Sequence, residues 1–352
     1  LIAGHTSNIL FLKKGNLIIA AANEIVLLVN PRTNEVQTRL TDSQREKKSE
    51  ITYMALSDEK LSLYLAAGHH DGDIALWDLE TLTLKTYLSG HRAQVSCMSF
   101  KDNNSILISG SHDNNIIVWD IITESALFKL EGHKNAITKI MPIKLSLDNT
   151  KLKSAEMNLI LSSSKDGLFK VWDLMIQDCV ATFPGSTNEI WSFEYIESER
   201  VVLLSSNLED VQILKLSFDG EKLRGESSIL KELEKFQRHS SARVLSMQLD
   251  PDGSLLYVIN ADKGIEIYRI LDEKEVQKKF KRKVKRAKEK NKTEEVENMD
   301  YDLYRGQFTN HLQYCATSSF SQKIRSLTFT PSKNMDKSQC YMNLHNNSLV
   351  SY

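Results

Sequence analysis

The chain has 352 residues, of which 41% are hydrophobic and 26% charged, and its formal net charge at pH 7 is −1. This is the composition of an ordinary globular protein with a buried core. No stretch approaches the roughly 18 consecutive apolar residues that a membrane-spanning helix needs, which excludes such a helix. The four cysteines are scattered, so neither a disulfide framework nor a cysteine metal site is predicted, and a reducing compartment is favoured.

Two short strands joined by a tight turn are predicted over Ile106–Asp120. Strand-forming side chains fill Ile106–Ser111 and Ile116–Trp119, and the Asp-Asn-Asn between them favours a turn. A Gly-His pair lies upstream, with His91 28 residues before Trp119, and Trp119 is followed by Asp. A Gly-His and a Trp-Asp at this distance are typical of one four-stranded WD40 blade of a β-propeller.

The polar side chains of this unit can satisfy one another inside the blade. We expect the Trp119 indole to donate a hydrogen bond to the Ser111 hydroxyl, and that hydroxyl to donate to the His91 imidazole. The other imidazole nitrogen would donate to the Asp113 carboxylate. Because an unsatisfied buried partner destabilises the fold by about 1–3 kcal/mol, we interpret this set as structural rather than catalytic.

The same pattern recurs in the neighbouring units. A second complete set follows at His133, Ser164, Asp166 and Trp172. The preceding unit keeps a partial set, Asp71 and Trp77, with His69 at the serine position and Lys47 near the histidine position. Three Trp-Asp pairs at related spacing are a strong signal for a WD40 repeat.

Degenerate copies extend the repeat over residues 1–352, which predicts a single all-β, seven-bladed WD40 propeller. The equivalent third-strand positions are Leu28, Trp77, Trp119, Trp172, Leu214 and Tyr268. Extra polar residues, expected in surface loops, fall in Thr41–Glu50, Lys144–Asn158 and Glu221–His239. The strands of unit seven are expected at Lys323–Thr330, Gln339–Leu344 and Ser348–Tyr352. We expect Leu1–Ala3 to add its fourth strand and close the ring.

A strongly basic segment follows the sixth unit. Val276–Lys292 contains ten Lys or Arg and one Glu, a net charge of +9, and an acidic block follows it. The absence of Pro and Gly from Leu271 to Arg305 predicts a charged helical insertion over residues 272–310, between blades six and seven. A narrow apolar stripe recurs at steps of four, four and three, at Val276, Phe280, Val284 and Ala287.

Three interpretations of this insertion remain open. The charges form a solvated helix or loop, they neutralise the phosphates of a nucleic acid, or the helix docks on an acidic protein. A nuclear import signal is compatible with the same residues. The candidate contact residues are Lys278, Lys279, Lys281, Arg282, Lys283, Lys285, Arg286 and Lys288.

No motif indicates an enzyme. The sequence has no Gly-rich phosphate loop, no His-Glu-x-x-His and no Gly-x-Ser-x-Gly. We interpret His69, His70 and Asp71 as turn residues rather than a metal site, because no fourth ligand is suitably spaced. Trp191 is expected in the core or at a rim contact. No catalytic residue, cofactor, metal or small-molecule substrate is therefore predicted.

The order of the motifs narrows the choice among WD40 proteins. The motifs are Ser109–Asp120, Gly132–Thr138, Ser162–Leu174 and Asn260–Ile270, the last leading directly into the basic segment. This order resembles the N-terminal propeller of the WD-repeat protein 3 family, a tandem double-propeller subunit of the UTP-B complex in the small-subunit processome. Members of that family carry a second propeller and a helical C-terminal region, so the chain resembles a fragment of a longer protein.

The resemblance implies a scaffold in ribosome biogenesis, located in the nucleolus of the nucleus. Its partners would be other UTP-B subunits and processome proteins, with contact to the U3 small nucleolar RNA or pre-rRNA and a role in processing toward 18S rRNA. The alternative is a WD40 adaptor in another complex, such as a ubiquitin-ligase substrate receptor or a signalling scaffold. That alternative would predict a peptide-binding top face and a dispensable insertion.

Overall fold

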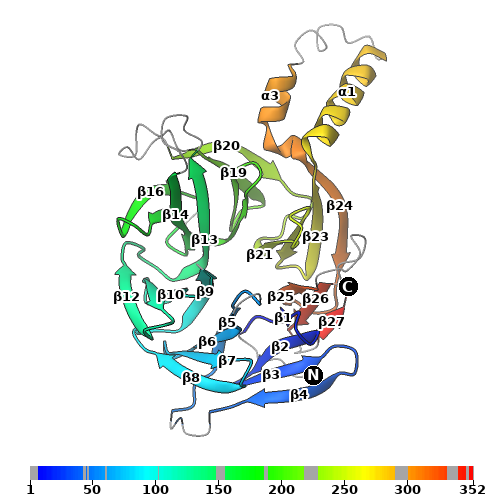
Figure 1. Ribbon diagram of the computed structural model, residues 1–352. Helices are drawn as coiled ribbons and strands as arrows, with labels where there is room; N and C mark the ends of the chain where they lie inside the picture. The colour runs from blue at the N-terminus through cyan, green and yellow to red at the C-terminus, as the bar shows by residue number, and fades with distance from the viewer. Residues whose placement is uncertain are drawn as a thin grey trace.

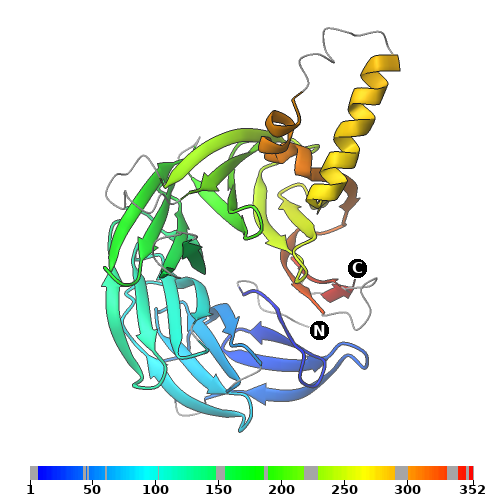
Figure 2. The same cartoon turned by 45° about the horizontal axis from the view of Figure 1, so that its top comes forward.

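The fold is a ring of antiparallel β-sheets around a central axis, with a helical arm on its outside (Figures 1 and 2). The computed structural model describes residues 7–42, 45, 47–59, 62–101, 103–147, 155–185, 189–217, 229–289, 300–330, 340–345 and 349–351. These residues form six four-stranded sheets and one three-stranded sheet. The all-β propeller is therefore confirmed.

The first three blades each consist of four consecutive strands. Blade one contains β1 (Leu10–Leu12), β2 (Leu17–Ala22), β3 (Ile25–Asn30) and β4 (Glu35–Leu40). Blade two contains β5 (Ile51–Leu56), β6 (Tyr64–His69), β7 (Ile74–Asp78) and β8 (Thr83–Leu88). Blade three contains β9 (Val95–Lys101), β10 (Ile106–Ser111), β11 (Ile116–Asp120) and β12 (Ser125–Leu130).

The remaining sheets continue the ring and carry the helices. Blade four contains β13 (Ile137–Leu147), β14 (Ala155–Ser164), β15 (Leu168–Asp173) and β16 (Asp178–Pro184). Blade five contains β17 (Ile190–Ile196), β18 (Val201–Ser206), β19 (Asp210–Leu216) and β20 (Leu230–Gln237). Blade six contains β21 (Val244–Leu249), β22 (Leu255–Asn260), β23 (Gly264–Ile270) and β24 (Leu312–Ser319). The three-stranded sheet contains β25 (Ile324–Phe329), β26 (Cys340–Leu344) and β27 (Leu349–Ser351). The helices are α1 (Glu273–Glu289), α3 (Tyr301–Gly306) and the 3₁₀ turn η1 (Phe308–His311).

The hydrophobic core lies between neighbouring blades. Second strands such as β10 and β18 are buried almost throughout, because a blade covers each of their faces, whereas the outermost strands β12 and β24 are mostly exposed. Trp119 of blade three packs in one cluster with Ile74 and Leu76 of blade two. Trp172 of blade four packs in the same way against Ile116 and Val118 of blade three. Each Trp-Asp tryptophan therefore joins its blade to the preceding one.

Hydroxyl side chains at the start of the inner strands join neighbouring blades. The bridges are Thr52 Oγ1 to Val95 O (2.5 Å), Ser96 Oγ to Ile137 O (2.5 Å) and Thr138 Oγ1 to Ile190 O (2.9 Å). The three-stranded sheet is linked to blade one by a related bond, in which the Ile9 amide donates to Ser326 Oγ at 3.2 Å. The innermost ring is thus held by repeated short polar contacts.

Seven complete blades were expected, and the described residues form six. The three predicted strands of the last unit are present as β25, β26 and β27, but this sheet has no fourth strand among the described residues. The strand expected at Leu1–Ala3, like Gly4 and His5, lies outside the described residues.

The position expected for the helical insertion was wrong. The strand after the helices, β24, pairs with β23 from Gly264↔Ser319 to Ile270↔Leu312, so it is the fourth strand of blade six. The insertion therefore interrupts blade six and does not separate blade six from the next sheet. The strand β24 was not recognised in the sequence because most of its side chains are exposed and it lacks a regular apolar pattern.

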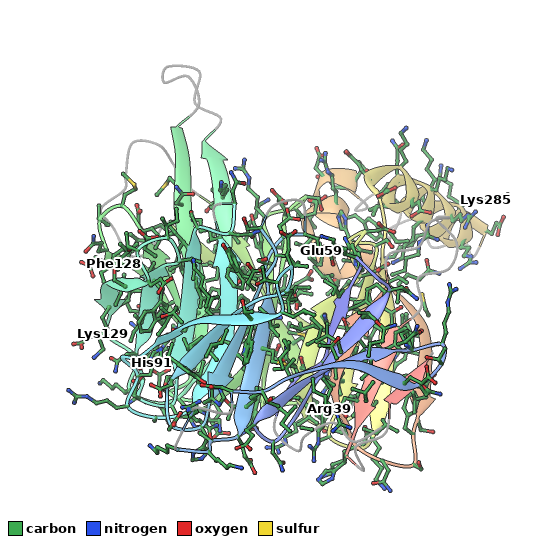
Figure 3. The ribbon with its side chains drawn as sticks, turned by 60° about the horizontal axis from the view of Figure 1, so that its bottom comes forward. Arg39, Glu59, His91, Phe128, Lys129 and Lys285 are labelled. Atoms are coloured by element: carbon green, nitrogen blue, oxygen red, sulfur yellow. The ribbon has the colours of Figure 1, made fainter. Side chains whose placement is uncertain are left out.

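Three further expectations need correction. Part of Lys144–Asn158 is not a loop, because Lys144–Leu147 pairs with Ala155–Asn158 and extends the β13–β14 hairpin, which projects beyond the ring in Figure 3. Glu221–His239 contains the strand β20. In blade three the bulge of the third strand lies between Val118 and Trp119, and in blade one it lies between Leu28 and Val29. The residue after the bulge is therefore equivalent to the tryptophan, so Val29 rather than Leu28 occupies the tryptophan position.

Candidate nucleic-acid and partner interface

The polar set of blade three forms one continuous chain of hydrogen bonds. His91 Nδ1 lies 3.0 Å from Asp113 Oδ2, and His91 Nε2 lies 2.8 Å from Ser109 Oγ. The Trp119 indole donates to the same hydroxyl at 2.8 Å. With a neutral imidazole, the Ser109 hydroxyl accepts from the indole and donates to the histidine, and every member has a partner.

Blade four repeats this arrangement almost atom for atom. His133 Nδ1 lies 2.9 Å from Asp166 Oδ2, His133 Nε2 lies 2.9 Å from Ser162 Oγ, and Trp172 donates to Ser162 at 2.8 Å. Burial alone would raise the pKa of Asp166, but hydrogen bonds from His133 and from the Lys134 amide outweigh it and lower the pKa to about 2. The network is therefore structural and contains an ionised carboxylate; we call such a set of buried hydrogen-bonded side chains within a blade a clamp.

The serines predicted for these networks were wrong by two residues. Ser111 Oγ donates instead to Ala93 O at 2.9 Å and accepts from the Asp113 amide. Ser164 Oγ likewise donates to Asn135 O. Residues two apart on a strand point to the same face, so periodicity does not distinguish them. The spacing does distinguish them, because in both blades the serine that binds the tryptophan lies ten residues before it.

Ser162→Ala is expected to lower the free energy of unfolding by at least about 2 kcal/mol, because the Trp172 indole and the His133 imidazole each lose a buried partner, at about 1–3 kcal/mol each. The measurement is urea unfolding at pH 7. The matched control is Ser125→Ala on the exposed strand β12, which should change stability by less than about 0.5 kcal/mol. Equal stability of the two variants would contradict the network.

Blade two has a different clamp, which the sequence did not reveal. Ala67 occupies the hydroxyl position, and Arg45 donates to Asp71 at 2.8 Å and to Asp73 at 3.0 Å. Lys47 reaches Asp71 only at 3.8 Å and is largely exposed. The Arg45 guanidinium also lies 4.8 Å above the Tyr87 ring. An arginine from a preceding loop thus replaces the histidine.

Blade six contains a second substituted clamp. Arg238 Nη1 donates to Asn260 Oδ1 at 2.8 Å and lies 3.4 Å from Glu266 Oε2, and both charged side chains are fully buried. Glu266 Oε1 also accepts from the Ser240 amide. The alignment placed Tyr268 correctly but did not identify these partners, because neither arginine nor glutamate belongs to the WD40 motif.

The basic helix α1 packs against α3 and the end of blade six. Val276 is fully buried and packs with Leu271 and Tyr304, and Phe280 packs against this cluster. Lys279 Nζ donates to Asn310 O at 2.9 Å. The predicted apolar stripe is therefore the face by which α1 contacts α3 and the propeller.

Seven of the eight candidate contact residues on α1 are exposed. They are Lys278, Lys281, Arg282, Lys283, Lys285, Arg286 and Lys288. Lys279 differs, since burial and then the neighbouring charge of Lys283 lower its pKa and its ammonium is bonded to backbone carbonyls. Lys283 Nζ lies 5.1 Å from the Tyr304 ring. Figure 3 shows Lys285 pointing away from the ring, so α1 presents a row of cations to solvent.

A membrane-spanning helix and a metal-binding cluster are both absent from the described part of the chain. No helix there is both long enough and apolar enough to span a membrane. Nor do three or more His, Cys, Asp or Glu side chains gather there in a group suited to a metal ion. His69 instead uses Nδ1 to contact Ser49 O at 2.9 Å, a structural bond within its blade.

Comparisons with known proteins agree with this architecture. The family described as WDR3 first beta-propeller domain matches residues 16–216. U3 small nucleolar RNA-associated protein 12 of Saccharomyces cerevisiae is 33% identical over 292 residues, which are 80% of this chain and 29% of that protein. The chain thus corresponds to less than a third of this relative. A crystal structure of a mitotic checkpoint complex contains a chain with a TM-score of 0.68 at 12% identity, covering 100% of this chain and 91% of that one, which shows the shared fold alone. The family match extends over more than half of the residues and confirms the resemblance drawn from the motifs, so the chain belongs to the WDR3 first beta-propeller domain family.

Proposed function

We propose that this propeller is a non-catalytic scaffold in ribosome biogenesis, acting in the small-subunit processome in support of pre-rRNA processing toward 18S rRNA. The observation that carries the proposal is the family membership, together with 33% identity to a protein named for its association with the U3 small nucleolar RNA. A ring of rigid blades suits this role because it presents loops and an arm without large internal motion.

The arm is the part of the scaffold proposed to contact RNA. Six exposed cations of helix α1 lie away from the buried stripe, whereas Lys279 and Lys283 contact Asn310 O and the Tyr304 ring on the packed side. Packing of the stripe against Leu271 and Tyr304 fixes the direction of the six. Exposed cations at fixed positions are suited to neutralising successive phosphates. The proposed RNA is the U3 small nucleolar RNA or pre-rRNA, the proposed protein partners are other UTP-B subunits, and the proposed location is the nucleolus.

The architecture proposed for this scaffold is a single seven-bladed ring over residues 1–352, within a longer protein. The three-stranded sheet would be the seventh blade, a proposal supported by its contact with blade one through Ser326. The insertion at 272–310 would be an appendage of that ring, because strands β23 and β24 pair across its ends.

The function is tested with a tagged full-length protein that contains this propeller, fractionated on a density gradient. We expect it to sediment with pre-ribosomal particles and to recover U3 RNA. A protein that stays entirely in the light fractions would contradict the proposal. A version without residues 1–352 is the comparison: if it sediments identically, the propeller is not the part that joins the particle.

A further inference from the structure

A small pocket lies where the helical arm meets blade five. Its volume is about 290 Å³, and both parts contribute to its lining. Glu199 and Lys215 come from blade five, whereas Asp302, Arg305 and His311 come from α3 and η1. The insertion therefore creates a pocket that blade five alone would not have.

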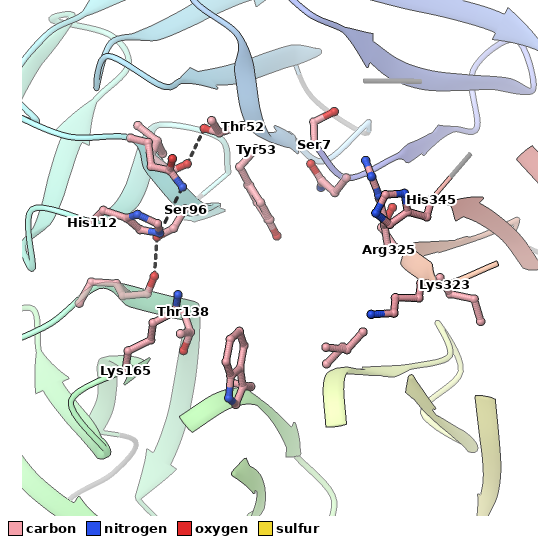
Figure 4. Close-up of a pocket in the computed structure, with 18 residues that line it drawn as sticks. Ser7, Thr52, Tyr53, Ser96, His112, Thr138, Lys165, Lys323, Arg325 and His345 are labelled. Atoms are coloured by element: carbon pink, nitrogen blue, oxygen red, sulfur yellow. Dashed lines mark hydrogen bonds between the residues drawn. The ribbon is translucent and has the colours of Figure 1, made fainter. Parts of the chain in front are cut away.

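This pocket is distinct from the cavity at the mouth of the central channel. His112 and Lys165 line the channel mouth (Figure 4), as does Trp191 at the start of β17. Glu199 lies just beyond the other end of β17, so the two cavities open at opposite ends of that strand.

The arm side of the pocket is fixed by contacts to two blades. Thr309 donates to the Glu234 carboxylate of β20 through its amide at 2.6 Å and its hydroxyl at 2.9 Å. The His311 carbonyl accepts from the Leu271 amide at the end of blade six, at 2.8 Å. Phe308 is buried in the core between blades five and six. The pocket is therefore preformed.

One acceptor in the pocket has no partner in the described part of the chain. His311 is 2% exposed, and its Nε2 donates to Arg305 O at 3.1 Å. Since a carbonyl oxygen only accepts, the proton of the neutral ring lies on Nε2 and Nδ1 is a free acceptor. That Nδ1 receives no hydrogen bond from a described residue. A ligand with a suitable donor would supply the bond that a buried acceptor needs.

Donors and acceptors meet around this histidine. Carboxylates are provided by Glu199 and Asp302, and cations by Lys215 and Arg305. The floor is apolar and is formed by Val201, Leu233 and Phe308. A nucleobase combines apolar faces with an edge of donors and acceptors, and unpaired RNA bases are read through those edges. A cationic peptide side chain fits less well, because the nearby cations of α1 would repel it while they attract phosphates.

We propose that this pocket binds one unpaired guanine base of the RNA contacted by α1, an inference that rests on the proposed function. Guanine carries two adjacent donors, N1–H and the 2-amino group, and a carboxylate such as that of Glu199 or Asp302 accepts from both. His311 Nδ1 accepts from the remaining amino hydrogen. Lys215 and Arg305 donate to O6 and N7, the acceptors of guanine. These base contacts supply selectivity, whereas α1 supplies the phosphate contacts.

The test measures selectivity for the base. Fluorescence anisotropy compares binding of the 352-residue chain to labelled uridine heptamers whose central base is guanosine, inosine or adenosine. Inosine keeps the O6, N7 and N1–H of guanosine but lacks the 2-amino group. We expect the guanosine heptamer to bind at least about fivefold more tightly than the adenosine heptamer, the lower end for one bidentate base contact, with inosine between them.

Glu199→Gln with Asp302→Asn is expected to abolish the preference for guanosine. The loss of two negative charges should at the same time strengthen binding of the adenosine heptamer slightly, which a variant that fails to fold would not show. The matched control is Glu197→Gln with Asp252→Asn, which removes two exposed acids that do not line the pocket and should retain the preference.

Equal affinity for the three heptamers, or a guanosine preference that persists in the Glu199 and Asp302 variant, would overturn the proposal. Salt-dependent binding without base preference would overturn the guanine pocket alone and leave RNA contact by α1 intact. No binding of any heptamer would contradict both.

Discussion

Replacing Arg238 with methionine is expected to lower the free energy of unfolding by about 3–5 kcal/mol, the range for removing one partner of a buried ion pair. The Arg238 and Glu266 side chains have no exposed surface. Without the guanidinium, the Glu266 carboxylate keeps the hydrogen bond from the Ser240 amide but has lost its buried cation, and the side-chain amide oxygen of Asn260 loses its donor. An uncompensated charge then remains between the strands of blade six.

Two comparison variants separate this effect from the loss of an arginine in general. Arg305 forms an exposed pair with Glu273 at 2.9 Å, and Arg305→Met is expected to change stability by about 1 kcal/mol or less. Arg238→Met combined with Glu266→Leu removes both charges and should recover most of the loss. Urea unfolding followed by circular dichroism measures all three. If Arg238→Met and Arg305→Met were equally stable, the buried pair would not be a clamp of blade six.

The repeat could be predicted from the sequence because its signals are local. Trp77, Trp119 and Trp172 occur at related spacing, and each lies on the third strand of its blade. The apolar stripe of α1 was equally visible, since one helix contains all four positions. Such patterns depend only on residues close to one another along the chain, so they can be recognised without knowledge of the tertiary structure.

The partners that complete each blade could not be predicted in the same way. Arg45 and Arg238 reach their carboxylates from segments 26 and 28 residues away, and nothing in their immediate sequence marks them as buried. The place of the insertion was missed for a related reason: β24 is recognised as part of blade six only by its pairing with β23. Both features arise from contacts formed after the chain has folded into the ring.

Replacing six exposed cations of α1 with glutamine is expected to weaken binding to single-stranded RNA by about four orders of magnitude at ~0.1 M salt, because the six lost phosphate contacts no longer release counterions, each worth about 0.7 log units at this salt relative to ~1 M. The six residues are Lys278, Lys281, Arg282, Lys285, Arg286 and Lys288. Lys279 and Lys283 are retained, since they contact Asn310 O and the Tyr304 ring and hold α1 in place. Glutamine has a helix propensity close to that of lysine and arginine, so the helix should persist.

The slope of the affinity against salt concentration decides whether phosphates are the ligands. Each phosphate contact contributes about −0.7 to the slope of log K against log salt for a single strand, so six lost contacts should flatten it by about 4. The control replaces three exposed lysines of blade five with glutamine, Lys215, Lys231 and Lys235, and should leave the slope nearly unchanged. A steep slope retained by the α1 variant would place the RNA elsewhere on the propeller. Absence of RNA binding by the unaltered chain would contradict the nucleic-acid interpretation and leave the other two, a solvated helix or a docking surface for an acidic protein.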